Sequence, residues 1–312
     1  MKYSYAIFAD ASCDLNPGLR SRFEVDGYLK SFISTPDADN VEVRIDLSDD
    51  ELDKFYSSLK AHKNGYKTSP ASIEEIALYF ESFLEKGLDV LALSMTSKMS
   101  ATHQLMVNAK EILSKKYPDR RVIVIDSMRV SAALGLLAAK ACALRAEGYT
   151  IEQNAEALEK IKRTVHQMGS LDDLFWVASK GRISYAKAFF GSIAGIKVLG
   201  DYDSDGMVTP LGKVSGYNKA FKATVEYIKK TIKDPRGQNI FVAYSARKEQ
   251  AEALAALIKE HIKPKEVVVF SVQQMSGINI GPGLAAAYYF GTEITDLKHE
   301  KEVLNDIIAN KL

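Results

Sequence analysis

Short apolar runs alternate with longer segments of helical periodicity through the first half of the chain. A short apolar run between polar residues is typical of a buried strand, and apolar residues three or four positions apart are typical of a helix that covers it. The alternation predicts an α/β fold in which helices wrap a parallel sheet. The strand-like segments are 5–9, 90–93 and 122–125, and the helix-like segments are 73–85, 101–115 and 131–147.

The pattern changes after a further helix, predicted over residues 151–167. Strand-like runs then become more frequent, which predicts a smaller α/β domain with a mixed sheet. We therefore predict an α/β/α parallel-sheet domain over residues 1–165 and a mixed-sheet domain over residues 166–312. A cleft between two such domains is a favoured ligand position. The later strands are expected at 196–199, 207–214, 240–244 and 267–271, with helices at 217–230 and 248–261.

A group of hydroxyl side chains follows the strand-like run at 90–93. Ser100 is placed to cap the helix at 101–115, but capping one helix accounts for only one hydroxyl. A helix N-terminus reached from the carboxyl end of a parallel strand suits an anion such as a carboxylate. The hydroxyl residues of this loop are Ser94, Thr96, Ser97, Ser100 and Thr102.

Thr68 and Ser69 are expected in a second loop, just before the helix at 73–85. The start of that helix is marked by a capping box of Ser72 and Glu75. If consecutive strand–helix units lie side by side, their loops converge at one edge of the sheet, so both hydroxyl loops would face one ligand. Neutral hydroxyls hold a carboxylate without attacking it, because no nucleophile–base pair accompanies them. The pattern favours binding over catalysis.

Charge and cysteine content exclude several classes of protein. The 312 residues contain 41 Lys plus Arg and 40 Asp plus Glu, so no basic surface for nucleic acid is expected. Cys13 and Cys142 cannot build a disulfide framework, and the N-terminal residues lack an export signal. The apolar-rich stretch at 132–143 is too short to cross a bilayer. We predict a cytoplasmic protein without stable membrane insertion.

Common catalytic and metal-binding motifs are missing from the sequence. There is no G-x-G-x-x-G after a strand, no P-loop and no G-x-S-x-G elbow, and the histidines have no metal-site spacing. His103 is interpreted as a helix surface residue. The stretch DYDSDG at 201–206 resembles half of a calcium loop, but Gly212 occupies the position that needs Glu, so we predict a hairpin turn. No cofactor or metal is expected.

Asp10 and Asp14 close the first strand-like run and leave two interpretations open. Such a pair is able to supply a phosphate-transfer nucleophile or bind magnesium, which would make the protein a metal-dependent phosphotransferase or hydrolase. Alternatively, Asp14 or Ser12 caps the turn that follows.

Several motifs, taken in order across nearly the whole chain, resemble those of the DegV family. This family comprises bacterial fatty-acid-binding proteins, including the binding subunit of the fatty acid kinase system. FADASCDLN at 8–16 resembles T-D-S-T-x-D-L-P, and SMTSKMSATHQ at 94–104 resembles S-I-S-S-x-L-S-G-T-Y-Q. The others are KTSPAS at 67–72 (T-S-Q-P-S), KGRIS at 180–184 (G-G-R-I-S), IKVLGDYDSDGMV at 196–208 (I-K-P-I-L and its D-G hairpin) and NIGPGL at 279–284 (H-T-G-P-G-A).

The resemblance implies a two-domain DegV-like fold with an acyl chain buried between the domains. In the family, the Thr of T-S-Q-P-S and the second Ser of S-x-L-S-G-T hold the carboxylate, and these residues correspond to Thr68 and Ser100. The same motifs place Ser69, Ser97, Asn279 and Gly281 at the site. Arg182 of KGRIS either meets a partner surface or helps to close the pocket.

The resemblance also implies a function without turnover. The protein is expected to bind a long-chain fatty acid such as palmitate in an interdomain tunnel. It would present the carboxylate to a separate fatty acid kinase, which forms acyl phosphate for phospholipid synthesis. The alternatives are the enzyme using Asp10 and Asp14, or a binder of a different amphipathic anion.

Asn279 is the main departure from the family pattern, because it stands where the family often has His. An amide donates a hydrogen bond but cannot become cationic. The change either leaves carboxylate binding intact while impairing acyl transfer, or marks a different ligand. The acyl length depends on the packing of tunnel residues, for which the candidates are Phe189, Phe190, Ile193, Met275 and Ile278.

Overall fold

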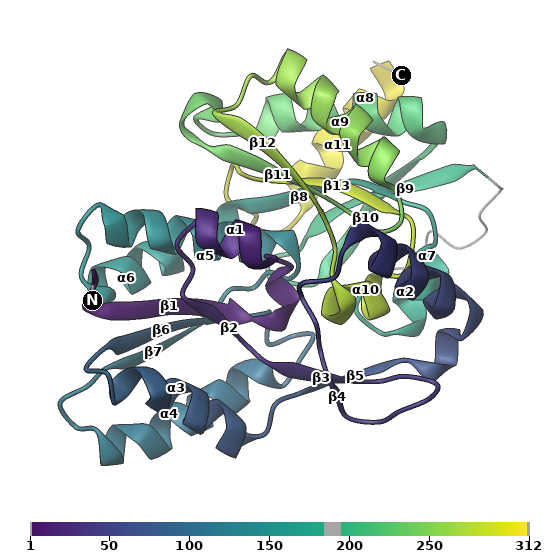
Figure 1. Ribbon diagram of the computed structural model, residues 1–312. Coiled ribbons are helices and arrows are strands. Elements are labelled where there is room, and N and C mark those ends of the chain that lie inside the picture. Colours follow the sequence, from purple (N-terminus) through teal and green to yellow (C-terminus); the bar gives the residue numbers. More distant parts are fainter. Residues whose placement is uncertain (1, 184–194, 311–312) are drawn as a thin grey trace. The chain divides into compact units, whose positions relative to one another are not determined.

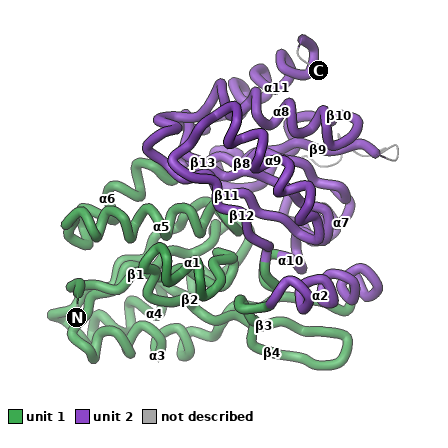
Figure 2. The backbone as a smooth tube through the Cα atoms, turned by 45° about the horizontal axis from the view of Figure 1, so that its top comes forward, with its two compact units in different colours: residues 1–47, 64–162, 273–276 green, residues 48–63, 163–272, 277–312 purple. Residues whose placement is uncertain are grey.

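The computed structural model describes residues 2–183 and 195–310, which divide into two compact units (Figure 2). Unit 1 contains Met1–Leu47, Asn64–Lys162 and Gln273–Ser276. Unit 2 contains Ser48–Lys63, Arg163–Val272 and Gly277–Leu312. The units are defined by contacts and are discontinuous in sequence. The domain boundary placed at residue 165 from the sequence stays a prediction.

A parallel sheet forms the centre of unit 1. Among the described residues it has four strands in the order β2-β1-β6-β7, and every pairing is parallel. Its strands are buried apolar runs, as expected for a parallel sheet covered on both faces. The strands are β1 (Tyr5–Asp10), β2 (Gly27–Leu29), β6 (Asp89–Ser94) and β7 (Val122–Asp126).

Helices cover both faces of this sheet and make unit 1 an α/β/α structure (Figure 1). On one face, Phe80 and Met106 pack on Phe8, Val90 and Ala92 of the central strands. On the other face, α5 packs against β1 and β6, and α6 packs against β6 and β7. The helices are α1 (Pro17–Arg22), α3 (Ile73–Leu84), α4 (Thr102–Lys116), α5 (Ala132–Ala146) and α6 (Ile151–Ile161). The parallel-sheet prediction is confirmed.

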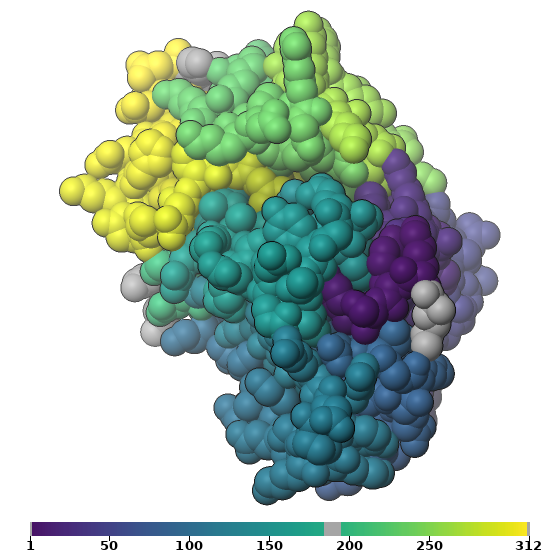
Figure 3. Space-filling model, turned by 90° about the vertical axis from the view of Figure 1, so that its left-hand side faces the viewer, coloured from purple at the N-terminus to yellow at the C-terminus, as the bar shows by residue number. Residues whose placement is uncertain are grey.

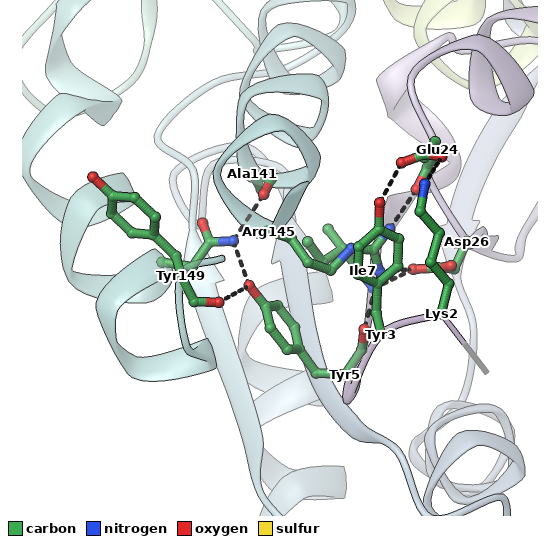
Figure 4. Close-up of polar contacts among 10 residues, drawn as sticks. Lys2, Tyr3, Tyr5, Ile7, Glu24, Asp26, Ala141, Arg145 and Tyr149 are labelled. Atoms are coloured by element: carbon green, nitrogen blue, oxygen red, sulfur yellow. Dashed lines mark hydrogen bonds and ion pairs between the residues drawn. The ribbon is translucent and has the colours of Figure 1, made fainter. Parts of the chain in front are cut away.

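Arg145 of α5 ties the N-terminal strand to the rest of unit 1 (Figure 4). Its guanidinium donates to the Asp26 carboxylate over 2.5 Å and to the carbonyls of Tyr5 (3.0 Å) and Glu24 (2.7 Å). Asn154 of α6 donates to the Tyr5 hydroxyl and to the Ala141 carbonyl. In Figure 3 the N-terminal segment is purple and the segment that contains α5 and α6 is teal. The network fixes α5, α6 and β1 together.

A small antiparallel sheet in unit 1 corrects one prediction. Its described strands run in the order β4-β3-β5, namely β3 (Ser31–Ser34), β4 (Val41–Glu42) and β5 (Lys67–Pro70). Thr68 pairs with Ile33 and Ser69 with Phe32, so both lie in strand β5 and not in a loop. The short polar sequence KTSP lacks an apolar alternation that would reveal a strand. Its pairing with β3 determines its conformation.

Unit 2 contains a mixed sheet, as predicted. Its described strands run in the order β10-β9-β8-β13-β11-β12, and only the β11–β12 pairing in this sheet is parallel. The strands are β8 (Val165–Leu171), β9 (Ile196–Tyr202), β10 (Val208–Ser215), β11 (Asn239–Tyr244), β12 (Glu266–Ser271) and β13 (Leu284–Phe290). The helix predicted over 151–167 is wrong at its end, because α6 stops at Ile161 and β8 begins at Val165.

Strands β9 and β10 form the predicted hairpin, in which the Asp203 carboxylate accepts from the backbone N–H groups of Asp205 and Met207.

One helix of unit 2 comes from early in the chain. No helix in the described part of the chain is long and apolar enough to span a membrane. The helices are α2 (Asp49–Ala61), α7 (Leu174–Ser179), α8 (Gly216–Thr231), α9 (Lys248–His261) and α11 (Lys298–Asn310); α10 (Gln274–Ile280) begins in unit 1.

A buried histidine lies in the centre of unit 2. Nδ1 of His166 is 2.6 Å from Asp201 Oδ2, and Nε2 is 2.8 Å from the Thr292 carbonyl oxygen. Both ring nitrogens therefore face oxygen atoms that are able to accept hydrogen bonds. The Tyr227 hydroxyl donates to the same carboxylate oxygen over 3.0 Å. The pair holds β8 to β9.

Candidate ligand-binding site

The carboxyl edge of the parallel sheet brings three strand ends together. The backbone N–H of Met95, just after β6, donates to Asp10 Oδ2 at the end of β1 over 2.5 Å. The Ser97 N–H donates to both carboxylate oxygens of Asp126 at the end of β7, each over 3.3 Å. The hydroxyl-rich loop 95–101 is therefore held between two carboxylates at this edge.

Two hydroxyls, one at the end of β6 and one in the loop, serve the local structure. Ser94 Oγ lies 3.0 Å from His103 Nδ1 and 3.3 Å from the Ile125 carbonyl oxygen. His103 lies on α4, is half-buried and makes this polar contact with Ser94. Thr96 Oγ1 accepts from the Lys98 N–H over 3.3 Å, which closes a local turn.

Ser100 and Thr102 form a hydroxyl pair at the start of α4. Their side-chain oxygens are 2.8 Å apart, and Ser100 Oγ also accepts from the Thr102 N–H over 3.2 Å. The helix begins at Thr102 with Ala101 at the N-cap, one residue later than predicted. Ser100 is half-buried and Ser97 is exposed. Ser100 still bonds a backbone N–H at the helix start, as a capping residue does.

Thr68 and Ser69 lie on a different sheet from the one that leads into the hydroxyl loop. They are neighbours on β5, so their side chains point to opposite faces of the small sheet. Thr68 is half-buried and Ser69 is exposed. The two segments are not equivalent strand–helix loops as predicted, because β5 is not part of the parallel sheet. The convergence of their hydroxyls on one ligand stays a prediction.

The Asp10 carboxylate accepts hydrogen bonds that stabilise the local structure. Its Oδ1 accepts from the Ser12 N–H (2.9 Å) and the Ser12 hydroxyl (2.5 Å), which caps the short 3-10 turn Ala11–Cys13. Burial raises the pKa of the Asp10 carboxyl. The predicted cap is present, but Asp10 supplies it and not Asp14 or Ser12.

Asp14 is also bonded on both oxygens. Oδ2 accepts from the Ser131 hydroxyl over 2.6 Å and Oδ1 from the Gln273 N–H over 3.0 Å. Burial raises the pKa of Asp14 to about 7. Within residues 2–183 and 195–310 no cluster of His, Cys, Asp and Glu is arranged to hold a metal ion. Two buried carboxyls with neutral donors do not form a magnesium site or an accessible nucleophile.

Asn279 and Gly281 lie at the end of α10 in unit 2. Asn279 is half-buried. Gly281 is buried with φ +76°, and its carbonyl accepts from the Ser245 hydroxyl over 2.7 Å while its N–H donates to the Gly277 carbonyl over 2.8 Å. A Cβ added at Gly281 would lie 2.5 Å from the Trp176 ring. The backbone groups of Gly281 thus bond within unit 2, and its missing Cβ leaves room for Trp176. Its expected ligand contact stays a prediction.

Arg182 follows helix α7 and is half-buried. Its guanidinium donates to the Lys180 carbonyl. Lys180 donates through Nζ to the Lys63 carbonyl over 3.3 Å, and Lys63 Nζ lies 4.7 Å from the centre of the Trp176 ring. The sequence interpretation did not identify Lys63, Trp176 or Lys180. The Lys in place of the first Gly of G-G-R-I-S was the available signal for one of them.

Some predicted residues lie outside the described part of the chain. Ser184 of the KGRIS motif is one. The tunnel candidates Phe189, Phe190 and Ile193 are the others.

Comparisons with known proteins agree on one family. The model of the DegV family, described as an uncharacterised protein family, matches residues 4–292. A DegV domain-containing protein of Clostridium perfringens is 28% identical over 291 residues, covering 92% of this chain and 97% of the relative. This match spans nearly the entire length of both proteins.

Solved structures share the fold. A fatty-acid-binding DegV family protein from Thermus thermophilus has a TM-score of 0.80 at 22% identity, covering 93% of this chain and all (100%) of that one. A DegV lipid-binding protein from Thermotoga maritima has a TM-score of 0.78 at 21% identity, covering 93% and 99%. The Streptococcus pneumoniae fatty acid kinase B3 protein, loaded with linoleic acid, has a TM-score of 0.76 at 20% identity, covering 92% and 99%.

Proposed function

Because this chain belongs to the DegV family, we propose that it binds a long-chain fatty acid such as palmitate and has no catalytic turnover of its own. The observation that carries the proposal is the hydroxyl loop between β6 and α4, which offers neutral donors at the carboxyl edge of the sheet. The fatty acids in the solved relatives support the ligand class. The engaged carboxyls of Asp10 and Asp14 weigh against the phosphotransferase alternative.

The donor geometry at Ser100 suits a carboxylate. A hydroxyl has one hydrogen to donate and two lone pairs that accept. Ser100 Oγ accepts from the Thr102 N–H, and it accepts a second time if the Thr102 hydroxyl donates to it. The Ser100 hydrogen is then directed to an external acceptor. In this proposal Thr68, Ser69, Ser97 and Asn279 supply the further polar contacts expected from the family motifs.

The acyl tail should dominate affinity. Each buried methylene contributes about 0.8 kcal/mol, so a sixteen-carbon tail offers roughly 10 kcal/mol before the costs of ordering. The interdomain tunnel expected from the resemblance stays a prediction. The hydroxyls would then orient the ligand and determine which end of it is presented.

A separate kinase is the proposed partner. The Streptococcus pneumoniae relative is a B component of a fatty acid kinase, which supports a substrate-presenting role here. In that role the protein holds the carboxylate for an ATP-dependent kinase that forms acyl phosphate. Asn279 retains hydrogen bonding to a carboxylate without contributing a positive charge.

The test is direct identification of the bound molecule. The protein is purified from cells, denatured and extracted with organic solvent, and the extract is analysed by mass spectrometry. We expect a stoichiometric long-chain fatty acid from the wild type and a reduced amount from Ser100→Ala. Ser114→Ala, on the exposed side of the same helix, is the matched control. A well-folded wild type that carries no lipid would refute the proposal. A wild type that carries a different amphipathic anion would refute it as well.

A further inference from the structure

Strand β7 forms one edge of the parallel sheet in unit 1, and no described strand pairs with its outer side. The direction of its backbone groups follows from a bond to β6, in which the Val90 N–H donates to the Arg121 carbonyl over 2.8 Å. Successive residues of a strand direct their N–H and C=O groups to opposite sides. The groups of Val122 and Val124 therefore point away from β6, towards the open edge.

These outward groups have no partner in the part of the chain that the structure describes. Within residues 2–183 and 195–310, the N–H and C=O groups of Val122 and Val124 form no hydrogen bond. Ile123 and Val124 are half-buried, so the strand is covered on its faces but not at its edge. A row of unpaired N–H and C=O groups at a sheet edge is a template for another extended chain.

Two other edge strands are protected against such pairing, whereas β7 is not. Strand β2, at the opposite edge of the same sheet, has only three residues. Strand β10, at one edge of the mixed sheet, contains Pro210 and a register shift between Pro210 and Gly212. Short strands, proline and bulges prevent edge-to-edge pairing. The sequence VIVID of β7 has five residues, an unbroken register and no proline.

A pocket continues this edge at the first residues of β7. Helices α4 and α6 flank the strand on opposite faces of the sheet (Figure 1). The pocket has a volume of about 500 Å³ and is lined by the last turns of α4, the first turn of α6 and the start of β7, all in unit 1. Its apolar lining includes Leu84, Leu113 and Val122. Val122 thus belongs both to the open edge and to the pocket.

Positive charge predominates around the pocket. Lys110, Arg120 and Arg121 line it together with Glu152. Arg121 pairs with Glu152, and Arg120 Nη1 lies 3.6 Å from Asp89 Oδ1 outside the lining. An apolar lining with an excess of cations suits an apolar side chain that is followed by carboxylates.

We propose that the β7 edge binds an extended acidic segment of a partner protein, which adds a strand to the parallel sheet. Backbone bonds to Val122 and Val124 give affinity, and the pocket selects an apolar residue next to carboxylates. At the other end of the strand the Asp126 carboxylate accepts from the Ser97 N–H of the hydroxyl loop. The added strand therefore brings the partner alongside this loop. The inference goes beyond the proposed fatty acid binding and does not require it.

Two fluorescein-labelled peptides, TVTVLEE and the reversed sequence EELVTVT, are the probes, because a strand is able to pair in either direction. Fluorescence polarisation with the full-length protein measures binding, and hydrogen exchange measures backbone protection. We expect one peptide to bind and to slow exchange at Val122 and Val124. N-methylation of every second residue should abolish binding for the set that faces β7 and preserve it for the other set, because only one set donates to the edge.

Substitutions in the protein locate the contact. Val124→Pro removes an outward N–H and no bond to β6, and it should weaken binding about tenfold or more. Lys110→Glu should also weaken binding about tenfold, because it reverses a charge at the pocket. Lys115→Glu is the matched control, since it makes the same charge change on an exposed residue of α4 outside the pocket lining. Its binding should stay within about twofold of the wild type.

The inference is overturned if neither peptide shows saturable binding below about 1 mM, or if both N-methylated sets bind equally. Equal effects of Lys110→Glu and Lys115→Glu would also overturn it, because binding would then follow net charge. A wild-type dimer that Val124→Pro dissociates would identify a second copy as the occupant and refute the partner. The N-methylated peptides decide the question even if Val124→Pro fails to fold. None of these measurements uses lipid, so their failure is distinguishable from failure of the proposed function.

Discussion

The Ser131 hydroxyl donates to Asp14 Oδ2 over 2.6 Å, joining the start of α5 to the turn after β1. Ser131 has φ 59° and ψ −142°, and Asp14 has φ 58°, so both ends of this contact have left-handed backbone φ values. Such conformations persist when surrounding contacts determine them. The second Asp14 oxygen holds the Gln273 N–H, at the start of α10. Asp14 thus connects three segments of unit 1 that are distant in sequence.

This contact predicts a dependence of stability on pH. The pKa of Asp14 is about 7 in the folded protein, whereas an ordinary aspartate has a pKa of 3.8, so the folded state binds an extra proton between these values. Stability contributed by that proton is present near pH 4 and is lost as the pH rises to 7, with a total of about 4 kcal/mol. Asp14→Asn should flatten the slope of unfolding free energy over pH 4–7, measured by urea denaturation. Asp10 and Glu300, whose pKa values are also raised, would leave a residual slope. An unchanged slope in Asp14→Asn would contradict the prediction.

The Arg145–Asp26 pair predicts that a substitution of similar size at Asp26 strongly lowers the free energy of unfolding. The Arg145 side chain is 2% exposed, and Asp26 accepts from its guanidinium over 2.5 Å. Asp26→Asn removes the compensating charge from a buried cation, which we expect to cost about 3 kcal/mol of unfolding free energy. Lys2→Ala, at the exposed Lys2–Glu24 pair in the same network, should leave the denaturation midpoint unchanged. Equal effects of the two substitutions would contradict the assignment.

Gly281→Ala should displace Trp176. The new Cβ would lie 2.5 Å from the ring, and the backbone φ of +76° adds strain for any residue with a Cβ. We expect a loss of about 2–4 kcal/mol and a shift of tryptophan emission to longer wavelength. Gly148→Ala is the control, since Gly148 has φ +91° but nothing within 4 Å of its Cβ position. Its cost should be that of strain alone, with unaltered emission.

The His166–Asp201 pair should be essential for unit 2. Asp201→Asn would break this buried pair and replace the carboxylate oxygen that also accepts from Tyr227, for which we expect a loss of about 3–5 kcal/mol. Chemical denaturation followed by circular dichroism measures it. Asp205→Asn, in the exposed turn of the β9–β10 hairpin, is a suitable comparison and should have little effect. Retained stability in Asp201→Asn would contradict the prediction.

If the fatty acid proposal holds, tail length should matter more than the head group. Replacing palmitate by laurate removes four methylenes, or about 3 kcal/mol, so affinity should fall by roughly two orders of magnitude. Ser100→Ala removes one charge-assisted hydrogen bond and should cost about tenfold. Calorimetric titration of the delipidated protein measures both. A stronger effect of Ser100→Ala than of the four methylenes would reverse this ranking.

Local patterns in the sequence predicted local structures well. The capping box of Ser72 and Glu75 is present at α3, because both halves of the motif lie within one helical turn. The DYDSDG turn also forms the predicted hairpin. These features depend on residues a few positions apart, which a sequence pattern records directly.

Features that depend on distant pairing were missed. Strand β8 contains the polar residues His166, Gln167 and Ser170, which interrupt the apolar pattern expected of a central strand. The hydrogen bond to Asp201 makes burial of His166 possible. Strand β13 is rich in alanine, which favours helices, so its sequence did not indicate a strand. The contacts of Lys63 with Trp176 and Lys180 link residues more than a hundred positions apart, beyond any local motif.

The discontinuous make-up of the two units has a consequence for how this gene can be divided. Residues 48–63 leave unit 1 for unit 2, and residues 273–276 return to unit 1. A single recombination break near residue 165 would therefore separate both segments from the residues they contact. We expect hybrids between distant relatives, and truncated halves expressed alone, to be insoluble unless each of these two segments is kept together with the unit that it contacts.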